Sequence, residues 1–194
     1  QLQVNMNSSP CSSHVMSSSG PRDEHHQAGS KALEVAPSQL GTEAGLGLFV
    51  QQAVAPGEVL CEYRGRTFTT AEAMRLEDKS YLMRVGPQEY IDAREDTSLI
   101  ARYINDCRNP AVYNVSFEKR PGEGRALVVA CRPISAGEEL FVDYGRWYWA
   151  KLRPTKIGVR QAAEILKDAE REAERQQRAM IPSAEGDFVE KLLQ

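Results

Sequence analysis

The sequence is poor in the residues that most often build metal and hydrolytic sites. Its four cysteines are single and widely spaced; none forms a Cys-x-x-Cys pair, and none has a histidine at zinc-finger spacing. A zinc site built from them is therefore not expected, and isolated thiols of this kind fit a reducing compartment. All three histidines, His14, His25 and His26, lie near the N-terminus. A hydrolase with a histidine base is disfavoured, because such a base must be held in a fixed geometry.

Long apolar runs and a strong net charge are also missing. No stretch approaches the roughly 18 consecutive apolar residues of a membrane helix, and no charged start leads into an apolar segment. Neither a membrane protein nor a signal peptide is therefore predicted, and the start at Gln1 indicates a fragment. With 24 Lys and Arg against 27 Asp and Glu, the net charge is −3. Direct nucleic-acid binding is not expected, and a basic partner such as a Lys-rich peptide is the better electrostatic match.

The character of the sequence changes twice along its 194 residues. Residues 1–38 are rich in serine and poor in apolar residues, which predicts a disordered N-terminal tail. Residues 39–149 alternate short apolar runs with turn signals, whereas residues 150–194 are dominated by a charged helical pattern. The sequence therefore predicts one folded domain between a tail and a C-terminal helical extension.

The domain is predicted to be mostly β with short helices. Val59–Tyr63 follows a turn signal, and Gly86-Pro87 and Pro121-Gly122 sit between pairs of apolar runs, as hairpin turns do. Thr69 and Glu72 form a capping box that should open a short helix. Short strands with glycine and proline between them favour several small sheets over a doubly wound nucleotide-binding fold.

The C-terminal extension carries apolar residues at helical spacing. They recur three and four residues apart on one face, at Val159, Ala162, Leu166, Ala169 and Ala173. An amphipathic helix packed on the domain explains this stripe, and a coiled-coil contact with a partner is the alternative.

Five short motifs in order carry the functional signal. They are Gly45-Leu46-Gly47-Leu48-Phe49, Glu62-Tyr63-Arg64-Gly65, Tyr81-Leu82 with Ile91-Asp92-Ala93, Ala101-Arg102-Tyr103-Ile104-Asn105 with Pro110, and Gly137-Glu138-Glu139-Leu140 with Asp143-Tyr144-Gly145. Each is weak alone, and the first is not a dinucleotide fingerprint because it opens a strand and lacks the third glycine. Taken together, the chain resembles the SET-domain family of protein lysine methyltransferases.

The resemblance implies a fold of several small sheets around a pseudoknot, and methyl transfer from S-adenosylmethionine to a deprotonated lysine. Tyr144 and Tyr81 are implied as catalytic residues that line the lysine channel with Val142. The implied cofactor-binding residues are Gly45, Leu46, Gly47, Asn105, Asp106, Tyr144 and Trp147. Tyr148 and Trp149 could equally cover the adenine or anchor the C-terminal helix, and Arg102 is expected to support the site. A Lys-bearing peptide, most often a histone tail, and a nuclear location are implied by the family alone.

The chain also departs from the family pattern. Where the family has Asn-His-Ser-Cys-x-Pro, this chain has Asp106 in place of the histidine, and the cysteine-rich zinc segments that flank many members are missing. The helix after Trp149 is expected to replace the missing channel wall. A small Val142 near Tyr144 leaves room for di- or trimethylation. The altered turn keeps a second interpretation open, an inactive module that binds a peptide or partner protein. A third interpretation is a methyltransferase for a non-histone protein.

Overall fold

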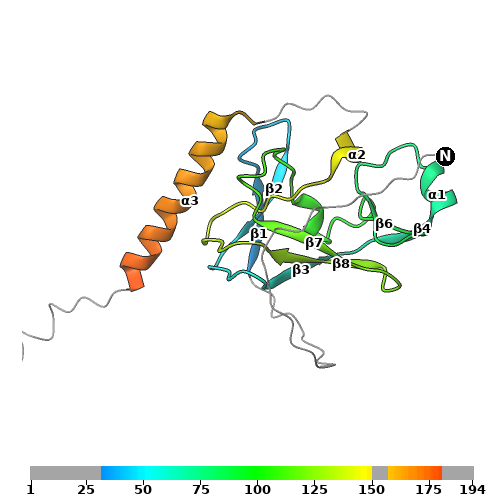
Figure 1. Ribbon diagram of the computed structural model, residues 1–194, viewed down its shortest axis with the longest axis horizontal. Helices are drawn as coiled ribbons and strands as arrows, with labels where there is room; N and C mark the ends of the chain where they lie inside the picture. The colour runs from blue at the N-terminus through cyan, green and yellow to red at the C-terminus, as the bar shows by residue number, and fades with distance from the viewer. Residues whose placement is uncertain (1–31, 150–156, 181–194) are drawn as a thin grey trace, which may run out of the picture.

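The computed structural model describes residues 32–149 and 157–180 (Figure 1). These residues form short strands, small helices and one long helix. In chain order the elements are β1 (Leu33–Pro37), β2 (Leu46–Val50), β3 (Val59–Tyr63), β4 (Arg66–Thr69), α1 (Thr70–Arg75), β5 (Leu82–Arg84), β6 (Glu89–Asp92), the 3-10 helix η1 (Ile100–Tyr103), β7 (Val115–Arg120), β8 (Arg125–Ala130), α2 (Arg146–Trp149) and α3 (Val159–Met180).

The strands of the described residues form three small antiparallel sheets. Their strand orders are β1-β2, β3-β8-β7 and β4-β6-β5, and both predicted hairpins, β5-β6 and β7-β8, are present. The mostly-β architecture with short helices and a C-terminal helix is therefore confirmed. One boundary is corrected: β1 lies inside the stretch assigned to the disordered tail, because Leu33–Pro37 pairs along the whole of β2. Residues 1–31 lie outside the described part of the chain.

Local sequence signals explain where the elements begin. The capping box is confirmed: Thr69 Oγ1 accepts a hydrogen bond from the Glu72 amide, and the Thr69 amide donates to the Glu72 carboxylate at 2.8 Å. This pair satisfies two free donors of α1. The sheets bury their inner faces in a shared core that includes Leu48, Leu60, Ile91 and Val128. Burying each of these side chains contributes about 1.5–3 kcal/mol.

A parallel bridge closes the pseudoknot. Asn105, which follows η1, pairs with Phe141, and the Val142 amide donates to the Asn105 carbonyl at 3.0 Å. The buried side chain of Asn114 holds the same segment, because its amide nitrogen donates to the Glu139 carbonyl at 2.8 Å and its oxygen accepts from the Phe141 amide at 2.8 Å. The chain on either side of the bridge is thereby brought together, so that Ile104 and Tyr144 become neighbours.

Helix α3 packs along one side of the domain (Figure 1). Ala162 is buried in a cluster with Cys107, Val112 and Phe141, and Ile165 packs against this cluster. The packed-helix prediction is therefore confirmed. The predicted stripe was wrong at its ends, because Val159 is 85% exposed and Ala173 is also exposed.

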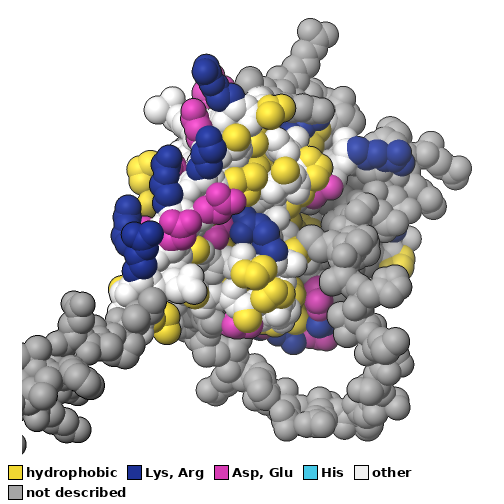
Figure 2. Space-filling view, turned by 60° about the vertical axis from the view of Figure 1, so that its left-hand side comes forward, with side chains coloured by type: hydrophobic (Ala, Val, Ile, Leu, Met, Phe, Trp, Pro, Cys, Tyr) yellow, Lys and Arg dark blue, Asp and Glu magenta, His cyan; other side chains and the backbone are white. Residues whose placement is uncertain are grey.

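The polar residues of α3 complete its contact with the domain. Gln176 donates to the Ala136 carbonyl at 3.1 Å. Figure 2 shows basic and acidic side chains interleaved on one face of the molecule. Within α3, Arg171 pairs with Asp168 and Arg175 with Glu172, each at 2.8 Å. Neither α3 nor any other helix of the described residues has the length and apolar character needed to cross a membrane.

Candidate active site

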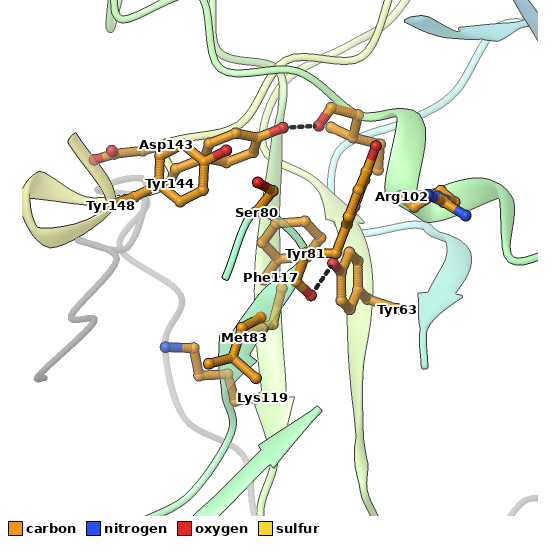
Figure 3. A pocket seen from close by; sticks show the side chains of 12 residues that line it. Tyr63, Ser80, Tyr81, Met83, Arg102, Phe117, Lys119, Asp143, Tyr144 and Tyr148 are labelled. Atoms are coloured by element: carbon orange, nitrogen blue, oxygen red, sulfur yellow. Dashed lines mark hydrogen bonds between the residues drawn. The ribbon is translucent and has the colours of Figure 1, made fainter. Parts of the chain in front are cut away.

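An aromatic pocket opens beside the pseudoknot (Figure 3). Its wall combines side chains from β3, β5, η1, β7 and α2 with the segment before α2. The lining residues are Tyr63, Ser80, Tyr81, Leu82, Met83, Arg102, Ile104, Phe117, Lys119, Asp143, Tyr144 and Tyr148. The pocket thus contains Tyr81 and Tyr144, the two tyrosines that the sequence analysis assigned to the lysine channel.

Tyr144 is held in place by the chain segment that follows η1. Its hydroxyl donates to the Ile104 carbonyl at 2.6 Å, and burial raises its pKa well above the ordinary value near 10. Tyr144 is therefore neutral at physiological pH. Because its proton is already donated to Ile104, the phenol oxygen offers its lone pairs to a donor in the pocket.

Tyr81 is held from two sides. Tyr63 donates its hydroxyl to the Tyr81 carbonyl at 2.7 Å, and the Arg102 guanidinium lies 4.2 Å from the centroid of the Tyr81 ring. Arg102 also donates to the Arg94 carbonyl at 3.0 Å, so it supports the pocket wall as expected. Tyr63 was not predicted as a pocket residue, although it stands in the Glu62-Tyr63-Arg64-Gly65 motif.

Asp106 is a hydrogen-bonding centre of the knot. Its side chain is 8% exposed and accepts hydrogen bonds from the Arg108 amide at 2.7 Å, the Tyr113 hydroxyl at 2.7 Å, the Tyr144 amide at 3.0 Å and the Trp149 indole at 2.7 Å. All four donors belong to the protein. The carboxylate that replaces the family's histidine is thus occupied in joining the knot to α2.

Aromatic residues of α2 continue the pocket wall. Tyr148 packs edge-on against Tyr144 with ring centroids 4.7 Å apart. Trp149 stacks on Tyr144, with ring centroids 5.9 Å apart and an angle of 14° between the ring planes. The pocket wall expected from the helix after Trp149 comes instead from Tyr148, since α3 contributes none of the lining residues identified within the described chain. The backbone of Trp147 lies in α2, but its side chain is outside the described residues.

Two of the predicted cofactor-binding segments, Gly45–Gly47 and Asn105, lie next to each other. Asn105 Nδ2 donates to the Leu46 carbonyl at 2.9 Å and to Glu139 Oε1 at 3.1 Å. The hydrogen bond to Leu46 links the Gly45–Gly47 segment to the pseudoknot. Gly45 has a φ of 70°, a conformation that glycine adopts without strain, and Leu46 is 45% exposed beside it.

Glu139 supports this turn and was missed as a site residue. Its carboxylate is 2% exposed, accepts hydrogen bonds from the Ser38 hydroxyl and the Gln39 amide at 2.7 Å each, and has a pKa raised by burial. A side chain on Gly47 would begin 2.2 Å from Glu139 Oε1. Gly47 is therefore required for the close approach of the carboxylate, a constraint that the sequence does not reveal because the partners are far apart along the chain.

Val142 lies behind the pocket, not in its wall. It is 1% exposed in the main core, and its amide is bonded to Asn105. Within the described residues, no cluster of three or more His, Cys, Asp or Glu side chains is arranged to hold a metal ion.

The small sheets, the pseudoknot and the tyrosine-lined pocket define the SET class of folds. The SET domain family matches residues 45–145, about half of the chain, and the chain belongs to this family. Similar proteins from Debaryomyces hansenii, Candida albicans and Saccharomyces cerevisiae are 33%, 33% and 34% identical over 106 residues. Each is described as a histone-lysine N-methyltransferase, H3 lysine-4 specific. The match covers 50% of this chain and 10% of each relative.

Proposed function

We propose that this domain is an S-adenosylmethionine-dependent protein-lysine N-methyltransferase. The observation that carries the proposal is the Tyr144 hydroxyl, bonded to the Ile104 carbonyl where the aromatic pocket meets the knot. A lysine side chain suits such a pocket because its methylene stem packs on aromatic rings, and its methylated cation is attracted by their π faces.

The residues present fit the proposed cofactor. Apart from its chain neighbours, no described atom lies within 4 Å of where a side chain on Gly45 would begin, so the turn is open beside the exposed Leu46. The Gly45–Gly47 backbone and Asn105 would hold the amino-acid end, with Trp147 or Trp149 near the adenine. S-adenosylmethionine supplies a methyl carbon on a sulfonium, so the amine lone pair can form the C–N bond as the C–S bond breaks.

The chain's own residues bind and orient the amine. The neutral Tyr144 accepts a hydrogen bond from it, while Tyr81 and Tyr148 exclude water and confine its stem. Alignment of this kind can supply much of the rate of a bimolecular transfer. Since the pKa values of Tyr63 and Tyr144 are raised by burial, neither tyrosine serves as a general base, and the lysine must enter the pocket uncharged.

A histone tail is the proposed substrate, with a nuclear, chromatin-associated role. The support is the description of the relatives as H3 lysine-4 methyltransferases. A non-histone protein remains a second substrate class for the same chemistry. Labelled cofactor with core histones and with cell extract separates the two, and loss of label with Tyr144→Phe ties the signal to this pocket. Equal labelling by the variant would remove Tyr144 from the mechanism.

The second candidate function is an inactive SET-like module that binds a peptide or partner. It is favoured by Asp106, because the side chain that replaces the family's histidine is committed to internal bonds. Calorimetry with S-adenosylmethionine distinguishes the candidates. Measurable affinity with turnover supports the enzyme, and no affinity in the folded protein supports the binding module.

A further inference from the structure

The side-chain amide of Asn105 can point in only one direction. Its nitrogen Nδ2 lies 2.9 Å from the Leu46 carbonyl and 3.1 Å from Glu139 Oε1. A backbone carbonyl and a carboxylate accept hydrogen bonds and do not donate them, so the NH2 group must face both oxygens. The reversed amide would set Asn105 Oδ1 against two acceptors. Both amide hydrogens are thus in use, and Oδ1, to which no donor among the described residues bonds, is the atom left for a ligand.

The β1–β2 loop holds Glu139 in the position that this orientation requires. Ser38 Oγ donates to Glu139 Oε1 and the Gln39 amide donates to Oε2, each at 2.7 Å. The Leu40 amide donates to Ser38 Oγ at 3.1 Å, so the Ser38 hydroxyl accepts there and directs its proton to the carboxylate. The Ser38 amide also donates to the Gly45 carbonyl at 2.9 Å. Both carboxylate oxygens are therefore fixed by a loop that ends at the proposed cofactor turn.

The charge of Glu139 is held without a cation from the described part of the chain. All three of its hydrogen-bond donors, which belong to Ser38, Gln39 and Asn105, are neutral groups. The next residue, Glu138, instead has an arginine partner at 2.9 Å. Buried charges are usually paired, so a cationic group that binds on the other side of the Asn105 amide would add compensation for this carboxylate.

We propose that Glu139 is the positioning residue that presents Asn105 Oδ1 to the α-ammonium group of the cofactor, so that the site selects cofactors whose amino-acid end is intact. The inference rests on the proposed S-adenosylmethionine site and names the residue that orients it. An ammonium group only donates, so it is complementary to an amide oxygen and is repelled by an amide NH2 group. Glu139 stands one hydrogen bond behind this contact, where burial limits the screening of its charge by water.

Two ligands isolate the contact in the folded protein. S-adenosylhomocysteine carries the α-amino group, whereas methylthioadenosine keeps the adenosine and lacks the amino-acid end. Calorimetry gives a Kd for each, and the preference is the Kd of methylthioadenosine divided by that of S-adenosylhomocysteine. Glu139→Gln removes the charge and sets an amide NH2 group among donors, so Asn105 loses its fixed orientation. The preference should fall by about tenfold, the size of a charge-assisted hydrogen bond, with the Kd of methylthioadenosine nearly unchanged.

Glu138→Gln is the matched control for loss of a buried glutamate. The Glu138 carboxylate accepts from the Ser135 amide at 2.6 Å and from Arg132 at 2.9 Å, and none of its hydrogen bonds within the described chain reaches Asn105. This variant should lower the melting temperature and leave the ligand preference unchanged.

Two further variants test whether Glu139 acts through Asn105. Asn105→Ala should reduce the preference as Glu139→Gln does, and the double variant should add little, because both remove the same contact. Ser38→Ala keeps the carboxylate but removes one of its donors, and it serves if Glu139→Gln does not fold. It should reduce the preference by about threefold, the size of one neutral hydrogen bond, and an unchanged preference overturns the proposal.

The outcomes separate this role from the function beneath it. If folded wild-type protein binds neither ligand, the cofactor site and the role of Glu139 are both overturned. If the wild type binds both ligands equally, or Glu139→Gln weakens both equally, the role of Glu139 is overturned and the cofactor site stands. A reduced preference in Glu139→Gln, in a protein that transfers no methyl group to core histones or extract, supports the role of Glu139 and overturns the enzyme.

Discussion

The Asp106 carboxylate accepts a hydrogen bond from the indole nitrogen of Trp149 at 2.7 Å and, through the same oxygen, one from the Tyr144 amide at 3.0 Å. One buried oxygen therefore links the knot, the tyrosine of the pocket and helix α2. Arg108 adds to this contact, since its guanidinium lies 5.1 Å from the Trp149 ring centroid. The family's histidine has thus been exchanged for a group that accepts without donating, and its surroundings supply only donors.

Asp106→Asn should destabilise the domain. The amide must place an NH2 group against donors, and a buried donor left without an acceptor costs about 1–3 kcal/mol. Thermal unfolding should show a melting temperature lower by roughly 5–10 °C. Asp96→Asn is the control, because Asp96 makes a comparable local turn with Ser98 at an exposed position. Equal melting temperatures for Asp106→Asn and wild type would contradict the central role of this carboxylate.

Two tyrosine hydroxyls should differ in their effect on turnover. Tyr144→Phe and Tyr63→Phe each remove a hydroxyl that donates to a backbone carbonyl in a partly buried place, so their stability losses should be similar. Only Tyr144 is placed to contact the amine. Tyr144→Phe should reduce kcat by about tenfold or more, as for loss of an oriented contact to the reacting group, whereas Tyr63→Phe should change kcat less. Single-turnover rates with saturating peptide provide the comparison, and the reverse order would be inconsistent with the assignment.

The rate should increase with pH without an early decline. The substrate amine has an ordinary pKa of about 10.4, so its reactive neutral fraction grows about tenfold per pH unit below that value. The pKa values of Tyr144 and Tyr63 are raised by burial, so both hydroxyls stay protonated over this range. Initial rates should therefore rise from about pH 7 to about pH 9.5. A descending limb within that range, in protein that circular dichroism shows to be folded, would mean that a tyrosine ionises earlier than its burial implies.

Gly47→Ala should disrupt the proposed cofactor turn. The new methyl would begin 2.2 Å from the Glu139 carboxylate, which is held by Ser38, Gln39 and Asn105 and cannot simply rotate away. Overpacking of this kind costs about 1–3 kcal/mol and should weaken cofactor affinity in calorimetry. Gly158→Ala is the matched control, because the position has open space. Unchanged affinity in Gly47→Ala would show that the turn is not part of the cofactor site.

The product should proceed beyond monomethyl-lysine. Val142 lies behind the pocket wall just before Tyr144. A phenylalanine or tyrosine at this position would need more volume and would press the wall toward the amine, whereas valine leaves that space for a methylated amine. A time course followed by mass spectrometry should show dimethyl or trimethyl peptide, and Val142→Phe should shift the distribution toward monomethyl. A wild-type time course that stops at monomethyl-lysine refutes this prediction.

The sequence predicted most reliably what depends on neighbouring residues. The capping box of Thr69 and Glu72 and the turns of both hairpins follow from local chemistry, and the family motifs led to Tyr81, Tyr144 and Asn105. The roles of Asp106 and Glu139 could not be read in the same way. Asp106 meets Trp149, and Glu139 meets Ser38, only after the knot has closed, and no local pattern encodes such distant partners. The stripe on α3 failed at its ends because periodicity does not tell where a supporting surface stops.

The parallel bridge between Asn105 and Phe141 has a consequence for how the protein is made. A nascent chain that has reached the end of β8 already contains the glycine turn, Tyr63, Tyr81 and Asn105, yet it lacks both Phe141 and Tyr144. Long-range pairings of this kind form late because the intervening loop must first be closed. The proposed active site should therefore be completed in one late step of folding, after the segment that carries Phe141 and Tyr144 has been made and has paired with Asn105.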